Sequence, residues 1–122
     1  MLIDSHSHLN FEAYKDDLSE VIGRCHQAKM KVINVGAALD TSIKAVEIAQ
    51  QEKDMYATIG LHPIHVFDEE FDAKVYQKII DENPEQIVAM GETGFDYFHL
   101  WQCLEKGAAS IEEAKAKQTE VF

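Results

Sequence analysis

Four short apolar segments alternate with segments of helical periodicity along this chain, and this alternation is the feature that most limits its fold. Each apolar segment is continuous, which is typical of strands buried on both faces of a parallel sheet. We predict strands over residues 1–5, 31–35, 55–61 and 86–91, and helices over 12–30, 42–53, 71–83 and from 110 to the end. The chain is therefore expected to form a parallel α/β sheet of strand–helix units.

Local signals support several of the predicted helix ends. Asp40 or Thr41 can cap the second helix, because a short polar side chain accepts a hydrogen bond from the free backbone amides there. Pro84 follows the third helix, which it cannot continue. Ser110 and Glu113 have the Ser-x-x-Glu spacing of a capping box, which predicts the start of the last helix.

Side chains suited to metal binding or proton transfer follow the predicted strands. They are His8 after the first strand, His62 and His65 after the third, and Glu92 and Asp96 after the fourth. The carboxyl ends of parallel strands carry the chemistry in both flavodoxin-like sheets and (β/α)8 barrels. This distribution is typical of a barrel whose active face lies at that edge.

His6 and His8 stand two residues apart at the end of the first strand. Alternation along a strand sends residues i and i+2 to the same face, so the two imidazoles are expected to converge. We interpret them as half of a metal site, with Asp4 behind them as a group that orients a ligand. The alternative is a pair of partly buried histidines that cap a strand.

Glu92 lies between Gly91 and Gly94, which allow a tight exit from the fourth strand. A carboxylate has two oxygens and can bridge two divalent metals, which an imidazole cannot do. The alternative for Glu92 is a helix cap or a solvated loop. His62 and His65 can bind a substrate phosphate or complete a metal shell, and the alternative for both is an exposed loop position.

The formal charge of −11 at pH 7 argues against a generic basic surface for nucleic acid. This acidic charge does not exclude a nuclease whose phosphate contacts are made by bound cations, because carboxylates must hold those cations. No segment approaches the roughly 20 apolar residues of a membrane span, so no membrane partner is expected. The N-terminus lacks the features of a signal peptide, and we expect a cytoplasmic location.

Two further groups of residues have structural interpretations. Cys25 and Cys103 match no Cys-x-x-Cys pattern and are expected to be free thiols. Four aromatic residues near the end of the chain are expected to pack in the core or in a lid, with stacking on a nucleobase as the alternative. They are Phe95, Tyr97, Phe98 and Trp101.

No glycine-rich phosphate loop is present, so no small-molecule cofactor is expected.

Four motifs occur in an order and spacing that resemble one known family. They are DSHSHLN at the start, INVG in the second strand, GLHPIHV after the third and GETGFDYF after the fourth. Over about its first 100 residues the chain resembles the N-terminal half of a TatD-family metal-dependent deoxyribonuclease, a member of the amidohydrolase superfamily. The resemblance implies a TIM-type (β/α)8 barrel, of which residues 1–122 would form the (βα)4 half with strands 1–4.

The resemblance also implies a hydrolase that cuts phosphodiester bonds in DNA with two divalent metal ions. His6 and His8 would bind one metal, and Glu92 would bridge the two, so that in the full-length protein a shared hydroxide attacks phosphorus. His65, Asp96 and His62 would contact substrate or orient the ligands. Histidine and carboxylate ligands suit Mg, Mn, Zn and Fe, so the metal stays open.

The remaining ligands of the family are two histidines and an aspartate from strands beyond the fourth, and His26 and His99 stand at the wrong places to replace them. We therefore expect the 122-residue chain alone to be inactive and to self-associate through its exposed sheet edges. Two alternatives remain open. One is another amidohydrolase or a polymerase-histidinol-phosphatase-type phosphoesterase, and the other is a catalytically inactive half-barrel that serves as a metal-binding scaffold.

Overall fold

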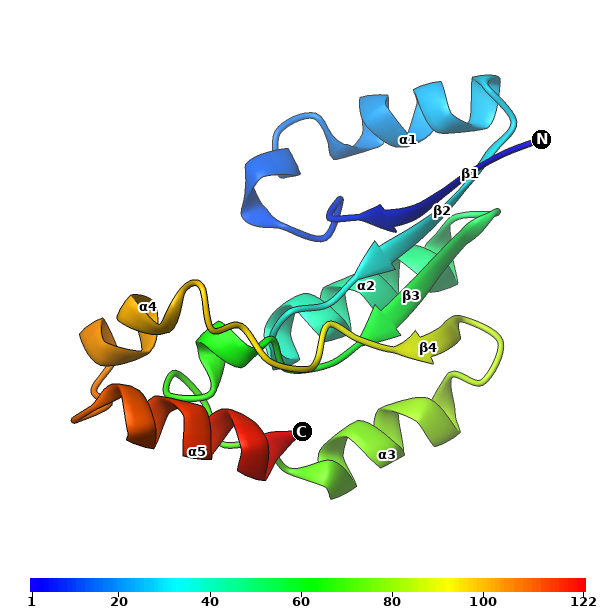
Figure 1. Cartoon of the computed structure of the whole chain (residues 1–122). Coiled ribbons are helices and arrows are strands. Elements are labelled where there is room, and N and C mark those ends of the chain that lie inside the picture. The colour runs from blue at the N-terminus through cyan, green and yellow to red at the C-terminus, as the bar shows by residue number, and fades with distance from the viewer.

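The computed structural model describes residues 1–122 and contains one four-stranded sheet (Figure 1). The strands lie in the order β1-β2-β3-β4, and every neighbouring pair is parallel. Their bounds are Leu2–Ser7 for β1, Met30–Val35 for β2, Met55–Ile59 for β3 and Ile87–Met90 for β4. The parallel α/β sheet predicted from the alternation is therefore confirmed.

Helices connect the strands and follow the last one. Their bounds are Leu18–Gln27 for α1, Leu39–Gln51 for α2, Ala73–Glu82 for α3, Leu100–Glu105 for α4 and Ile111–Val121 for α5, with short 3₁₀ helices η1 at Glu12–Tyr14 and η2 at Pro63–His65. The arrowheads of the strands point towards the side on which α4 and α5 lie, and the N-terminus is at the opposite side (Figure 1). None of these helices is long and apolar enough to cross a membrane.

The helix predicted over 12–30 is wrong in its bounds. Residues 12–14 form η1, a turn follows, and α1 begins at Leu18 after its N-cap residue Asp17. Asp17 has φ −129° and ψ 9°, outside the helical region, and its side chain makes no capping hydrogen bond. The helix ends before Lys29, whose φ of 52° lies in the left-handed region.

Two other helices differ from the prediction. α2 begins at Leu39, three residues early, and Thr41 lies inside it, where its Oγ1 accepts from the amides of Ala37 and Ala38 (2.9 Å each). α4 was not predicted, because its six residues show too little periodicity to be recognised. The predicted cap at Ser110 is confirmed, since its Oγ accepts from the amide of Glu113 at 3.1 Å.

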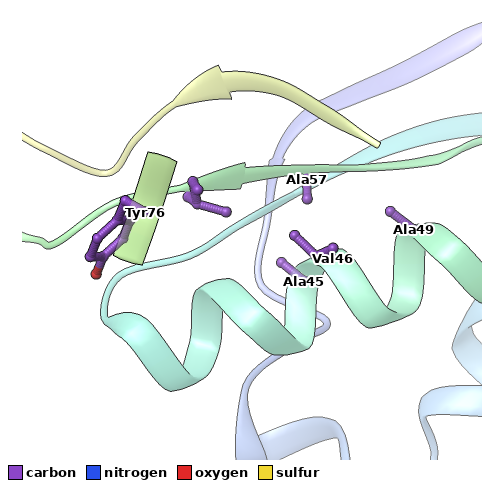
Figure 2. Packing of buried hydrophobic residues seen from close by; sticks show 6 residues of the cluster. Ala45, Val46, Ala49, Ala57 and Tyr76 are labelled. Atoms are coloured by element: carbon purple, nitrogen blue, oxygen red, sulfur yellow. The ribbon is translucent and has the colours of Figure 1, made fainter. Parts of the chain in front are cut away.

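The main core forms between α2, β3 and α3 (Figure 2). Ala45, Val46 and Ala49 of α2 face Ala57 of β3, and the small alanine side chains let the helix lie close to the sheet. Tyr76 of α3 closes one end of this cluster and is 2% exposed. Burial, followed by the carboxylate of Glu69, raises the pKa of Tyr76 well above its ordinary value, so its hydroxyl stays protonated.

The two edge strands remain open. β1 and β4 each have one hydrogen-bonded neighbour, and both carry exposed apolar side chains. These are Leu2, Ile3, Val88 and Met90, each at least half exposed. A closed barrel of this type needs eight strands, so the sheet has the strand number and the open edges of half a barrel.

The prediction for the two cysteines is confirmed, and part of the prediction for the aromatic residues after β4 is wrong. Cys25 is half-buried and Cys103 is buried, and both are free thiols as predicted. For the aromatic residues after β4, which were expected to pack in the core or in a lid, packing in the core is wrong because their side chains are exposed. Their exposed fractions are 49% for Phe95, 53% for Tyr97, 84% for Phe98 and 53% for Trp101.

Candidate metal centre

Three side chains that are far apart in the sequence meet at the carboxyl end of the sheet. His6 lies in β1, His8 follows it directly, and Glu92 follows β4. Each offers one ligand atom, and these atoms lie within 4.8 Å of one another. His6 Nε2 is 3.0 Å from Glu92 Oε1, and the imidazole centroids of His6 and His8 are 5.0 Å apart. The structure therefore brings together the three residues that the sequence suggested as metal ligands.

A backbone contact orients the imidazole of His8. Its Nδ1 is 3.0 Å from the carbonyl oxygen of Val35, at the end of the neighbouring strand β2. A carbonyl oxygen only accepts, so Nδ1 must carry the proton and donate. The lone pair then stands on Nε2, which is the arrangement in which a neutral histidine binds a metal.

Backbone contacts across the sheet place Glu92. Its amide donates to the carbonyl of Gly36 at 2.8 Å, and the amide of Gly91 donates to Ile59 at 2.8 Å. The Gly91–Glu92 peptide bond is cis. A Cβ atom on Gly60 would lie 2.6 Å from the carbonyl oxygen of Glu92, so glycine is required there for the ends of β3 and β4 to approach.

The chemistry of this donor set suits a divalent cation. Two imidazoles and one carboxylate match the preferences of several first-row metals and of Mg²⁺ for nitrogen and oxygen ligands. The side chain of His6 is 56% exposed and that of Glu92 is 26% exposed. The cluster is therefore open to solvent on one side and leaves room for further ligands.

His62 lies beside this cluster without joining it. It lines a pocket of about 350 Å³ together with Glu92 and Asp96. Its Nδ1 accepts from the amide of Ile64 at 3.2 Å, so the proton of the neutral ring stands on Nε2. Burial lowers the pKa of His62, and the nearby carboxylates of Glu92 and Asp96 offset this only in part.

Asp96 lies outside the metal cluster and binds His99. Its Oδ2 is 2.7 Å from His99 Nδ1, and its Oδ1 accepts from the amides of Phe98 and His99. Burial acts to raise the pKa of Asp96, but the hydrogen bonds from His99 outweigh it, and the pKa is below its ordinary value. The Asp-x-x-His spacing could have indicated this pair from the sequence.

Replacing His99 by Ala is expected to raise the pKa of Asp96 towards the ordinary aspartate value of about 3.9. In the unchanged chain, the depressed pKa adds stability above the pKa of the unfolded state, and this stability is lost as pH falls through the folded pKa. The acid-induced loss should therefore be smaller in the variant. Carboxyl NMR titration measures the pKa, and His26→Ala is the control. An unchanged Asp96 pKa in His99→Ala would contradict the assignment.

The structure places His65 away from the three ligands. Its Nδ1 is 2.6 Å from Asp68 Oδ2 and 3.2 Å from Lys106 Nζ. Burial acts to raise the pKa of Asp68, but hydrogen bonds from Lys106 and His65 outweigh it and keep the pKa low. The role of Lys106 had no signal in the sequence, because it follows α4 and reaches His65 across 41 positions.

Gln118 connects the two loops that border the pocket. It is 1% exposed, and its Oε1 accepts from the amide of Asp96 at 3.0 Å. Its Nε2 donates to the carbonyls of Pro63 (3.2 Å) and Asp96 (3.3 Å). With all these hydrogen bonds, the buried amide of Gln118 fixes the loop after β3 relative to the loop after β4. The sequence showed no sign of this role, because a glutamine inside a helix is usually an ordinary surface residue.

Comparison with known proteins places the chain in one family. The model of the TatD-related DNase family matches residues 3–122. An uncharacterised metal-dependent hydrolase of Bacillus subtilis, YabD, is 38% identical over 80% of this chain and 38% of its own length. Another from Mycoplasma genitalium is 34% identical over 84% of this chain and 40% of its own length. The chain thus spans about two fifths of these relatives.

The fold agrees with the family. The crystal structure of YjjV, a TatD homologue from Escherichia coli, superposes with a TM-score of 0.68 at 24% identity, over 98% of this chain and 46% of that one. The expected half of a TIM-type α/β barrel is therefore confirmed. With the family model matched from residue 3 to the last residue, the chain belongs to the TatD-related DNase family.

Proposed function

We propose that residues 1–122 form the first half of a single barrel domain that hydrolyses phosphodiester bonds in DNA with two divalent metal ions. The observation that carries this proposal is the convergence of His6, His8 and Glu92, whose ligand atoms lie within 4.8 Å of one another. The convergence occurs at the carboxyl end of a parallel sheet, where enzymes of this architecture place their chemistry.

The residues have distinct roles in this proposal. His6 and His8 would hold one ion through their imidazoles, and Glu92 would contribute its carboxylate to both ions. Divalent ions bound there would supply Lewis acidity and a water of lowered pKa. His62, with the proton of its neutral ring on Nε2, donates a hydrogen bond to a phosphoryl oxygen.

Two other residues act at the border of the site. Asp96, held by His99, positions the loop after β4, and Phe95 of this loop lines the pocket beside Glu92. His65 contacts the substrate at the outer side of the loop after β3, where Asp68 and Lys106, which pair with each other, hold its imidazole. The net charge of −11 supports phosphate recognition through the metals rather than through a basic surface.

A second candidate function is an inactive half-barrel that only binds metal. It is favoured by the small number of converging donors, because the chain brings three ligand atoms together and a two-metal site needs more. The open strands β1 and β4 also favour self-association over a stable single chain. An experiment must therefore separate metal binding from hydrolysis.

Joining residues 1–122 to the second half of the Bacillus subtilis relative separates these possibilities. The completed barrel is expected to cleave a DNA oligonucleotide and bis-p-nitrophenyl phosphate with Mn²⁺ and to lose both activities in EDTA. The 122-residue chain alone is expected to bind Mn²⁺, to self-associate in analytical ultracentrifugation and to hydrolyse neither compound.

Other outcomes would support the alternatives. Preference for p-nitrophenyl phosphate, a monoester, would favour a phosphoesterase of another kind. Metal binding by the completed barrel without hydrolysis of any ester would favour the scaffold. Cleavage that persists in EDTA would contradict the role of the metal ions altogether.

A further inference from the structure

A helical hairpin follows β4 and packs against the loop after β3. It consists of α4 and α5, which lie together on the side to which the strands point (Figure 1). Leu100 and Cys103 of α4 share a buried cluster with Ala114 of α5, and Phe67 of the loop after β3 packs against this cluster. The hairpin and that loop therefore have a small core of their own.

Two polar side chains of the hairpin hold consecutive carbonyl groups of η2. Gln118 of α5 donates from Nε2 to the carbonyl of Pro63 at 3.2 Å. Lys106, which follows α4, donates from Nζ to the carbonyl of Ile64 at 3.0 Å and also pairs with Asp68 just beyond η2. Gln118 is buried, so water cannot replace it as the donor. η2 is thus attached to the hairpin at its first two residues.

His62 stands directly before η2, and two different parts of the chain fix it. Its amide donates to the carbonyl of Ala37, after β2, at 2.8 Å, which ties its backbone to the sheet. Its ring is held from η2, because Nδ1 accepts from the amide of Ile64 at 3.2 Å. The direction of the imidazole therefore depends on η2, whereas the place of the His62 backbone does not.

A single peptide group connects Gln118 to the ring of His62. The carbonyl of Pro63 and the amide of Ile64 belong to the same planar, rigid unit. Its oxygen accepts from Gln118 Nε2, and its amide donates to His62 Nδ1. Hydrogen bonds in a chain polarise one another, so the bond from Gln118 makes this amide a better donor. Gln118 thereby helps to keep Nδ1 an acceptor and the proton of the neutral ring on Nε2.

The candidate metal ligands are held without the hairpin. His8 Nδ1 donates to the carbonyl of Val35, and the amide of Glu92 donates to that of Gly36. Both acceptors lie at the end of β2. The hydrogen bonds of Gln118 to the loop after β4 are at Asp96, four residues beyond Glu92. A change in Gln118 should therefore disturb His62 and leave the metal ligands in place.

We propose that Gln118 is a positioning residue for His62, which directs the Nε2–H group of this imidazole towards a substrate phosphate beside the metal centre. This inference rests on the proposed function, in which His62 donates a hydrogen bond to a phosphoryl oxygen. It adds that the tautomer and the direction of that donor are set from α5, 55 positions beyond Pro63. Lys106 supports the same arrangement through the next carbonyl of η2.

Gln118→Met tests the proposal, because methionine keeps the size of the side chain and removes its hydrogen bonds. Long-range proton–nitrogen NMR of the 122-residue chain at about pH 8, where imidazoles are neutral, shows which ring nitrogen of His62 carries the proton. His62→Ala identifies the signals. The unchanged chain should have the proton on Nε2, and Gln118→Met should have a mixture of both tautomers. Calorimetry should show the same affinity for Mn²⁺ in the two chains.

Gln77→Met is the matched control, since Gln77 is an exposed glutamine of α3 that bonds only to Asp81. It should leave the His62 tautomer unchanged. Circular dichroism shows whether each variant is folded. Lys106→Met provides a second route that spares the buried amide, and it should also mix the tautomers, because it releases the carbonyl of Ile64.

Hydrolysis of bis-p-nitrophenyl phosphate by the completed barrel measures the consequence for catalysis. Gln118→Met should lower kcat about tenfold, the scale of one hydrogen bond to a charged group. His62→Ala should lower it at least as much. The double variant should be no slower than His62→Ala alone, because a residue that acts only through another adds nothing once that residue is gone.

Three results would overturn the proposal. One is an unchanged His62 tautomer in a folded Gln118→Met chain or, if that chain is unfolded, in Lys106→Met. The others are additive losses in the double variant and a weaker affinity for Mn²⁺ in Gln118→Met, which would mean that Gln118 supports the whole site. A mixed tautomer, together with full hydrolysis by His62→Ala, would refute the role of His62 in the proposed function and leave its positioning by Gln118 standing.

Discussion

Replacing Glu92 by Gln is expected to lower the affinity of the chain for Mn²⁺ by about 100-fold or more. Loss of a group that merely orients a metal ligand costs about 10- to 100-fold, and in the proposed site Glu92 would be a direct ligand and is the only carboxylate in the cluster. Glutamine keeps the shape but removes the charge and the ability to share two ions. In the completed barrel, hydrolysis of DNA should fall about 1000-fold, because metal ions contribute several kcal/mol to transition-state stabilisation.

Isothermal titration calorimetry measures the affinity for Mn²⁺, and Glu85→Gln is the matched control. Glu85 is an exposed carboxylate that precedes β4, whereas Glu92 follows the same strand. The control removes an equal charge and should leave Mn²⁺ binding unchanged. Equal losses in the two variants would mean that general electrostatics, and not ligation by Glu92, attracts the cation.

Gly60→Ala is expected to destabilise the chain and to weaken metal binding together. Its new Cβ would lie 2.6 Å from the carbonyl oxygen of Glu92 and 2.8 Å from the carbonyl carbon of Gly91, which are backbone atoms that cannot rotate away. The end of β4 must therefore shift. Overpacking of this kind costs about 1–3 kcal/mol of unfolding free energy. The affinity for Mn²⁺ should fall about tenfold or more, since Glu92 moves away from His6.

Gly23→Ala provides the opposite case in the same chain. Gly23 lies in α1, and apart from its chain neighbours and the backbone of its own helix, no atom lies within 4 Å of the position where its Cβ would stand. Alanine should therefore stabilise the chain by up to about 1 kcal/mol through helix propensity, without any effect on Mn²⁺ binding. Urea denaturation measures both changes. Unchanged metal affinity in a destabilised Gly60→Ala variant would show that the ends of β3 and β4 move independently of the site.

The sheet and the neighbourhood of the metal ligands were accessible from the sequence for a simple reason. Continuous apolar strands separated by helices can form only a parallel sheet whose carboxyl ends share one edge. Residues that follow different strands must then lie along that edge, whatever separates them along the chain. Strand positions placed His6, His8 and Glu92 at that edge, but β1 and β4 are opposite edges of the sheet. Their convergence was implied by the resemblance to a barrel family and is seen in the structure.

Helix bounds were less accessible, because local competition decides them. Asp17 and Thr41 both favour caps, yet Asp17 precedes α1 and Thr41 lies in the first turn of α2. In the folded chain the Thr41 side chain accepts from two backbone amides, whereas the Asp17 side chain makes no capping hydrogen bond. The sequence shows only that both residues can accept such hydrogen bonds.

The sequence by itself determined the α/β class, the parallel direction of the strands and the kind of side chains at their carboxyl ends. Only the tertiary structure decided which nitrogen of His8 is free, that Asp96 binds His99, and that Gln118 joins two loops. It also decided that the aromatic side chains after β4 face solvent. The physical reason is that periodicity is a local property of the chain. Proton positions, buried hydrogen bonds and exposure depend on partners that loops bring from far along it.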